Sequence, residues 1–424
     1  ICPQHGASMA VLDNDAAYYR LSTRDNTGAI FARDLVDDHG HAHFPDAPAD
    51  AACCADGSAC ATDQHDNVTC TLLMEITNAC NLACRVCYAD SKGDRVLPFD
   101  DVRAYLGKIL NERGGLDSVQ VTGGEASLHP DFWRIIAFLH DEPRIKKIYL
   151  PTNGLLFAKL EHAQKLVPFK SKLLVLLQFD SVAHEANMAL RAADPQRARM
   201  TVVDELARLG VFMQLTMTLA KGVNDDEAGA IVQLGLTHDH VKVVALQPAT
   251  SSGRYDLPLD PMERTTLSDV VKVVRAARKD AEMVPIPCSH PNCGWITLFF
   301  RRFGIVENLA RHIDLREHRP QLTNKALLST DELRDVVSGV VSDADAPGVI
   351  ERIKRAVGKR IVRSQDIFTV AVKPFMDKHT YDQDRINTCC HHLMDTHGAV
   401  TSFCEYNALL RPGDSWDRLP VLPA

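Results

Sequence analysis

The 424-residue sequence has no long hydrophobic run, no run of basic residues and no internal repeat. Because no stretch approaches eighteen apolar residues, we expect no segment that spans a membrane, although peripheral contact with a membrane surface stays open. The formal net charge of −8 argues against nucleic acid as the main partner. No secretory signal is visible, and whether residues precede Ile1 in the native chain stays open.

Cysteine, by contrast, is abundant. The chain has 13 cysteines, an odd number, and they fall into tight groups instead of spreading along the sequence. Spread cysteines would indicate a secreted disulfide framework. Tight groups favour metal sites in a reducing compartment, so we predict a cytoplasmic location.

Three of these cysteines follow one another in a C-x₃-C-x₂-C pattern, as Cys80, Cys84 and Cys87. The apolar run Leu72–Ile76 precedes them, which places them in the loop after a first strand. Three thiolates can hold three corners of a [4Fe–4S] cluster and leave one iron open. Zinc sites more often pair C-x₂-C knuckles, so we favour iron–sulfur over half of a zinc site or a chance cluster.

A second motif, Gly123-Gly124-Glu125, ends the apolar strand pattern Val119–Thr122. Glycines let backbone carbonyls approach a ligand closely, and a carboxylate pairs with an ammonium group. Together with the cysteine triplet and the aromatic Tyr88 that follows it, this motif resembles the radical S-adenosylmethionine (SAM) superfamily. The resemblance implies that Cys80, Cys84 and Cys87 bind the catalytic cluster and that Gly123–Glu125 hold the amino group of SAM.

Strand and helix patterns alternate from Leu72 to Ala249, which predicts a parallel sheet. With the resemblance, the expected α/β fold is a partial (β/α)₆ TIM-type barrel with Cys-rich N-terminal and C-terminal extensions. The expected regions are 1–70 (metal-binding extension), 71–249 (radical SAM barrel) and 250–424 (auxiliary-cluster and substrate region). The predicted strands are Leu72–Ile76, Ser118–Thr122, Lys147–Leu150, Leu173–Gln178, Val211–Thr218 and Val241–Gln247. The predicted helices are Asp101–Arg113 with Asp100 as N-cap, Asp131–His140, Leu156–Leu166, Arg197–Leu209, Asp225–Leu236 and Pro261–Lys279.

Ligands of such barrels sit at the carboxyl ends of the strands. The resemblance implies that polar groups there bind the ribose, carboxylate and adenine of SAM. For each residue a purely structural polar role is an equal alternative. The predicted cofactor-binding residues, besides Gly123–Glu125, are Tyr88, Asn153, Gln178, Asp180, Gln214 and Gln247.

The other cysteines form two groups, one on each side of the barrel sequence. Downstream, Cys288, Cys293, Cys390 and Cys404 suffice for an auxiliary iron–sulfur cluster. Upstream, Cys54, Cys60 and Cys70 can form a second iron–sulfur, iron or zinc site. The choice between Cys53 and Cys54, and between Cys389 and Cys390, stays open. Cys2 with His5 is a weak zinc-knuckle pattern, and we interpret His39, His41 and His43 as part of a solvated loop.

The run Cys54-Ala-Asp-Gly-Ser-Ala-Cys60-x₄-His65-x₄-Cys70 resembles the archaeal tetraether lipid synthases and the related class D radical SAM methylases. The C-terminal runs Val372–Asp377, Tyr381–Arg385, Cys389–His392 and Phe403–Asn407 share this resemblance. One departure is that the family tends to have another cysteine where this chain has Gly57 and Ser58, which leaves the N-terminal site undefined.

The resemblance implies reductive cleavage of SAM to a 5′-deoxyadenosyl radical, which takes hydrogen from an unactivated C–H bond. The first hypothesis is C–C bond formation on a lipid alkyl chain, with an electron donor such as ferredoxin or flavodoxin. Ile296–Phe300 could line a lipid tunnel with Arg301 and Arg302 at a phosphate, although a buried strand with surface arginines is the simpler interpretation. The alternatives are a methylase or alkylase of a small ring such as a pterin, and a non-catalytic multi-cluster electron carrier.

Overall fold

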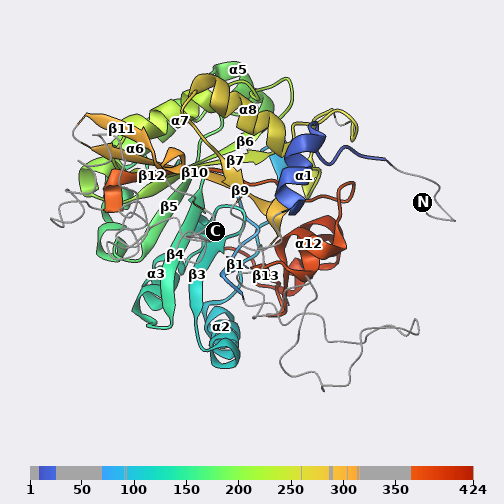
Figure 1. The fold of residues 1–424 in the computed structure, drawn as a ribbon. Coiled ribbons are helices and arrows are strands. Elements are labelled where there is room, and N and C mark those ends of the chain that lie inside the picture. Colours follow the sequence, from blue (N-terminus) through green and yellow to red (C-terminus); the bar gives the residue numbers. More distant parts are fainter. Residues whose placement is uncertain are drawn as a thin grey trace, which may run out of the picture.

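The computed structural model describes residues 9–24, 69–89, 91, 93–258, 260–285, 290–302, 304–312, 315 and 364–423. Six parallel strands form the centre of the fold, in the chain order expected from the sequence. Helices lie around the outside of the curved sheet (Figure 1). The six strands are β1 (Thr71–Glu75), β3 (Leu116–Thr122), β4 (Ile145–Thr152), β5 (Leu173–Gln178), β6 (Met213–Leu219) and β7 (Val241–Pro248). The predicted α/β fold with a partial TIM-type barrel is therefore confirmed.

Helices connect these strands, as parallel pairing requires. Several predicted helix bounds differ from the structure, and the predicted helix Pro261–Lys279 begins only at Leu267. Asp100 lies in the first turn of α2 and is not its N-cap, because the helix begins directly after Pro98. The predicted helix Leu156–Leu166 is reduced to the short α4. The helices are α1 (Ala16–Arg24), α2 (Phe99–Arg113), α3 (Phe132–Asp141), α4 (Leu160–Gln164), α5 (His184–Arg191), α6 (Gln196–Leu209), α7 (Ala228–Thr237), α8 (Leu267–Ala277), α12 (Gln383–Asn387) and α13 (Phe403–Glu405).

The C-terminal part of the chain extends the same sheet at both edges. Strand β13 (His391–Met394) pairs in parallel with β1, and β12 (Ile367–Val372) pairs in parallel with β7. Within the described ranges the sheet thus has twelve strands. The remaining members are β9 (Val284–Pro285), β10 (Trp295–Arg302), β11 (Ile305–Asn308) and β14 (Val400–Ser402).

A small separate ladder joins the cysteine loop to the region after the barrel. Strand β2 (Val86–Cys87) pairs antiparallel with β8 (Arg254–Tyr255). The Nε of Arg254 also donates to the backbone carbonyl of Cys84 at 2.6 Å. The loop that carries the three cysteines is therefore tied to the chain some 170 residues further on.

The core lies between the sheet and the outer helices, and its strand residues are mostly Val, Leu, Ile and Met. Alternate residues of each strand point to the opposite, concave side, where several are polar. None of the helices in the described ranges is long and apolar enough to cross a membrane.

Candidate active site

A cavity of about 400 Å³ occupies the concave side of the barrel. Cys80, Cys84 and Cys87 line one end of it, together with Gly123–Glu125. Residues of β7, β10 and β12 also line it. Both predicted motifs therefore face one space.

The cysteine loop leaves β1 in a defined conformation. The hydroxyl of Thr77 accepts a hydrogen bond from the backbone N–H of Ala79 at 3.1 Å and donates to the carbonyl of Arg95 at 2.7 Å. Burial raises the pKa of the Cys80 thiol to about 11. Iron would bind the thiolate and release this proton.

The two glycines let the end of β3 approach this loop. The N–H of Gly124 donates to the Thr77 carbonyl, and the N–H of Glu125 donates to the Ala79 carbonyl, both at 2.8 Å. A Cβ atom at Gly124 would lie 2.0 Å from the Ala79 oxygen. Only glycine fits this close approach of the two backbones.

The carboxylate of Glu125 is buried at the floor of this end. It accepts hydrogen bonds from the hydroxyls of Ser127 (2.7 Å) and Thr152 (2.8 Å) and from the backbone N–H of Asn153 (2.9 Å). Burial raises the pKa of Glu125 in spite of these bonds. A buried carboxylate held in this way can receive an ammonium group.

A group of charged side chains lies behind the cysteines. Asp180 accepts two hydrogen bonds from Arg191, at 2.7 and 2.6 Å, and lies 3.4 Å from Arg199. Burial alone would raise the pKa of Asp180, but the two arginines outweigh it and hold this pKa at about 2. Burial favours the neutral form of Arg191 and so lowers its pKa. The Asp180 carboxylate, followed by Cys84, outweighs this effect and raises the pKa of Arg191.

These residues fit the cofactors that the cysteine motif implies. The Nη2 of Arg199 is buried without a hydrogen-bond partner, and Arg199 lines the cavity at the cysteine end. A free guanidinium nitrogen can receive a carboxylate, and Glu125 can receive an amino group. The donor set thus suits the two polar ends of an amino acid beside three thiolates.

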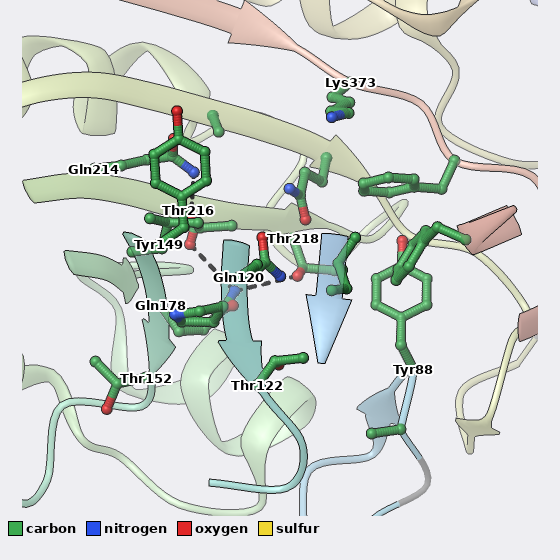
Figure 2. Close-up of a pocket in the computed structure, with 18 of the residues that line it drawn as sticks. Tyr88, Gln120, Thr122, Tyr149, Thr152, Gln178, Gln214, Thr216, Thr218 and Lys373 are labelled. Atoms are coloured by element: carbon green, nitrogen blue, oxygen red, sulfur yellow. Dashed lines mark hydrogen bonds between the residues drawn. The ribbon is translucent and has the colours of Figure 1, made fainter. Parts of the chain in front are cut away.

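Of the other predicted SAM-site residues, all but Asp180 line the cavity. Tyr88 lines the cavity and packs edge-on against Phe375 and Phe403, at ring-centroid distances of 5.5 and 5.6 Å. Asn153, Gln178, Gln214 and Gln247 also line the cavity. Figure 2 shows Gln178 and Gln214 on neighbouring strands, with Tyr88 and Lys373 on the other side of the view.

Asp180, in contrast, is fully buried and does not line the cavity. The amide of Gln178 donates to Asp180 at 2.7 Å and to the Thr216 carbonyl at 3.1 Å. For Asp180 the structure thus favours the alternative of a structural polar group, which positions Gln178 and Arg191.

The described cysteines outside the triplet form two groups. In the first, ligand atoms of Cys70, Cys390 and His391 all lie within 4.8 Å of one another. In the second, Cys293, Cys389 and Cys404 are close enough to interact electrostatically. Burial, followed by the Cys404 thiolate, raises the pKa of Cys389 to about 12, and burial also raises the pKa of Cys404.

The predicted grouping of these cysteines therefore needs a correction. Cys390 was expected with Cys293 and Cys404, but its sulfur lies with Cys70 and His391. The backbone pairing explains this: the Cys390 carbonyl accepts from the N–H of Cys70, which brings these two residues together. Cys2, His5, His39, His41, His43, Cys53, Cys54, Cys60, His65 and Cys288 lie outside the described residues.

The hypothesis of a phosphate contact by the β10 arginines is wrong. Arg301 is buried and donates to the carbonyls of Gly235 (2.6 Å) and Val241 (2.5 Å), so it is not at the surface either. Arg302 pairs with Asp366 at 2.8 Å. Ile296 and Leu298 do line the cavity.

Sequence reasoning missed several cavity residues, among them Gln120, Arg191, Arg199, Lys373 and His391. One signal was available for Arg199. It shares a helix face with the buried Val202, Val203 and Leu206, and a charged residue at such a position needs a partner. Lys373 and His391 carried no comparable signal, because the sequence does not show that β12 and β13 join the barrel.

Comparisons with known proteins agree with this geometry. A family model described as the radical SAM superfamily matches residues 74–235. The 7,8-dihydro-6-hydroxymethylpterin dimethyltransferase of Methanocaldococcus jannaschii is 23% identical, over 99% of this chain and 91% of that protein. The GTP 3′,8-cyclase of Syntrophomonas wolfei is 26% identical, over 44% of this chain and 58% of that enzyme.

Among solved structures, Streptococcus suis SuiB bound to the precursor peptide SuiA superposes with a TM-score of 0.42 at 16% identity, over 50% of this chain and 47% of that chain. The matched region 74–235 contains the cysteine loop and the Gly-Gly-Glu strand end described above. Residues 74–235 are therefore a domain of the radical SAM superfamily, whose cofactors are SAM and a [4Fe–4S] cluster.

Proposed function

We propose that this protein is a radical SAM methylase or alkylase of a small planar ring. The observation that carries the proposal is the polar lining of the cavity beyond the cysteine end. Four glutamines, Gln120, Gln178, Gln214 and Gln247, face the same space as Thr216 and Thr218. Ligand pockets usually place a few polar groups among apolar ones, and these fix the orientation of the ligand.

The similarity to a pterin dimethyltransferase over nearly the whole chain supports the same choice. A pterin is a flat bicyclic ring with hydrogen-bond donors and acceptors around its edge. Amides and hydroxyls on the cavity wall are complementary to such an edge.

The chain's own residues have separate tasks in this proposal. Cys80, Cys84 and Cys87 would hold the cluster, Glu125 the amino group of SAM and Arg199 its carboxylate. When bound, the cluster and SAM supply the electron and the hydrogen-abstracting group of radical chemistry. Tyr88, Phe375 and Phe403 exclude water from this end, because their rings pack against one another beside the cysteines.

The two further cysteine groups are proposed as metal sites of the same enzyme. Cys293 and His391 both line the cavity, so either site would face the substrate. The site at the first group would use Cys70, Cys390 and His391, and Cys54 and Cys60 stay predicted ligands of that region. The site at the second group would use Cys293, Cys389 and Cys404, with Cys288 as a fourth ligand.

C–C bond formation on a lipid chain stays a second candidate, because one observation favours it. Part of the cavity wall is apolar, with Val243, Ala245, Ile296 and Leu298 on it. The predicted electron donor of the ferredoxin or flavodoxin type and the cytoplasmic location also stay predictions.

The test is anaerobic incubation of the iron-loaded protein with SAM, dithionite and one of two substrates, a 6-hydroxymethyl-7,8-dihydropterin or a long-chain diether lipid. We expect the pterin to gain a methyl or alkyl carbon and to increase the yield of 5′-deoxyadenosine. If only the lipid does so, the lipid candidate replaces the ring. If a fully loaded protein forms no 5′-deoxyadenosine at all, the electron carrier replaces both.

A further inference from the structure

Two of the cavity glutamines have unused side-chain amides. Gln178 and Gln214 donate to neighbouring residues, Gln178 to Asp180 and Gln214 to the Thr216 hydroxyl at 2.9 Å. The amides of Gln120 and Gln247 make no hydrogen bond to any described residue, although both line the cavity. Both side chains are half-buried, so their amides are open to a ligand in the cavity.

Gln247 belongs to a polar row across three adjacent strands. It is the register partner of Thr218 on β6. On its other side, Val372 pairs with Leu246, and the N–H of Lys373 donates to the Leu246 carbonyl at 2.9 Å. Thr218, Gln247 and Lys373 therefore follow one another along the carboxyl ends of β6, β7 and the end of β12.

Gln120 comes from the other side of the barrel. It lies on β3, which β4, β5 and β6 separate from β7. Figure 2 shows Gln120 in the centre of the view, between Gln178 and Thr218, with Lys373 further along the wall. Because both amides line one cavity, a flat ring between them can contact Gln120 on one side and Gln247 on the other.

Lys373 adds a cationic donor to this row. Its Nζ lies 2.6 Å from the Nε2 of His391 and 5.6 Å from the centre of the Phe375 ring. An ammonium group only donates hydrogen bonds, whereas an amide both donates and accepts. The row thus presents a hydroxyl, an amide and an ammonium group in a fixed order.

We infer that Gln120 and Gln247, with Lys373 beside them, recognise the lactam edge of a nitrogen heterocycle. The inference rests on the proposed function and deepens it, because it assigns substrate binding to Gln247 instead of SAM binding. A cyclic amide offers one donor and one acceptor side by side, which one glutamine amide can meet with two hydrogen bonds. Lys373 would donate to a ring oxygen or an unprotonated ring nitrogen. An alkyl chain would leave both amides buried without partners, which is unfavourable.

The test is the affinity of the iron-loaded, SAM-bound protein for 6-hydroxymethylpterin, measured by quenching of pterin fluorescence. We expect Gln120→Leu and Gln247→Leu each to raise the Kd at least about tenfold, equal to about 1.4 kcal/mol. Lys373→Met should raise it as well, and Lys373→Arg should restore part of the affinity. Gln233→Leu, which changes an exposed glutamine on α7, is the matched control and should leave the Kd unchanged.

A second ligand and a second readout make the result decisive. Quinoxaline has a similar bicyclic shape without the lactam, and it should bind at least tenfold more weakly than the pterin to the unaltered protein. Equal binding of the two ligands, or unchanged pterin affinity in both leucine variants, overturns the inference while the proposed ring substrate stands. If Gln247→Leu raises the Kd for SAM and leaves the Kd for pterin unchanged, Gln247 binds SAM, as the sequence analysis predicted, and not the substrate. If the unaltered protein binds no pterin but still cleaves SAM, the proposed substrate itself is wrong.

Discussion

At the scale of single residues, the site depends on buried charges that hold one another in place. Glu125 and Asp180 are both inside the protein, but their surroundings differ. Glu125 has hydroxyl and N–H donors around it, whereas Asp180 has two arginines. Glu125 can therefore take a cation from a ligand, while Asp180 is already neutralised by the protein.

Removing the Glu125 carboxylate should weaken SAM binding. We expect Glu125→Ala to raise the Kd for SAM at least about tenfold, because the amino group loses its charged partner. Equilibrium dialysis of the iron-loaded protein measures this value. Glu161→Ala is the control, because Glu161 has a largely exposed side chain on α4. An unchanged Kd in Glu125→Ala would remove this residue from the SAM site.

The Asp180 carboxylate should be important for stability. Asp180→Asn leaves Arg191 and Arg199 buried without a counter-charge, which typically costs about 3–5 kcal/mol. Denaturant unfolding of the two proteins side by side measures the difference. Asp256→Asn removes an exposed partner of Arg85 and should have little effect. Equal losses in the two variants would contradict the role of the buried network.

Some of these residues could be read from the sequence and some could not. Cys80, Cys84, Cys87 and Gly123–Glu125 lie in two short motifs, so local spacing was enough to predict them. Cys70 and Cys390 are separated by 320 positions, and no local pattern shows that they meet. Arg191 was missed together with its helix, because α5 has only eight residues.

At the scale of elements, the end of β3 and the loop after β1 form one unit. The two backbones touch at Gly123 and Gly124, and β2 with β8 holds the other end of the cysteine loop. The geometry of the three thiols is thus set by backbone contacts as much as by the cysteines themselves.

Adding one methyl group at this contact should disturb the cysteine loop. We expect Gly124→Ala to reduce both the iron bound after reconstitution and the affinity for SAM, since the new Cβ collides with the Ala79 carbonyl. Gly107→Ala on α2 is the control, because nothing lies within 4 Å of the added atom. Alanine favours helices over glycine by up to about 1 kcal/mol, so this variant should be at least as stable. Normal iron and SAM binding in Gly124→Ala would show that the loop does not need the close approach.

The elements of the barrel were predictable because buried parallel strands read as continuous apolar runs. All six predicted strands are present, with ends that differ by a few residues. Strands β12 and β13 were not predicted, because their partners are far away in the sequence. Lys373 and His391 lie at the ends of β12 and β13. Because these two strands were not predicted, the predicted site lacked the residues on that side of the cavity.

At the scale of the whole molecule, the C-terminal segment completes the barrel. Strands β13 and β12 cover the two outer strands of the six-stranded core, β1 and β7. The same segment contributes His391 to the cavity wall, and Cys389, Cys390 and Cys404 to the two cysteine groups. Barrel and C-terminal segment therefore share one site.

The two cysteine groups should bind metal independently of the triplet. We expect a protein with Cys80, Cys84 and Cys87 all changed to alanine to lose SAM cleavage and to retain iron. In that background Cys389→Ala and Cys390→Ala should each remove a different part of the remaining metal, because the two thiols belong to different groups. Metal analysis with EPR and Mössbauer spectroscopy distinguishes these outcomes. Loss of all metal in the triple variant would contradict separate sites.

The pairing of β1 with β13 also bears on how the protein is made. Strand β1 leaves the ribosome long before β13, since about 320 residues separate Thr71 from its partner His391. Until translation reaches that point, one flank of β1 has no neighbour, and an uncovered strand invites pairing with other nascent chains. The wall beside β1 is therefore complete only once the C-terminal segment has been made.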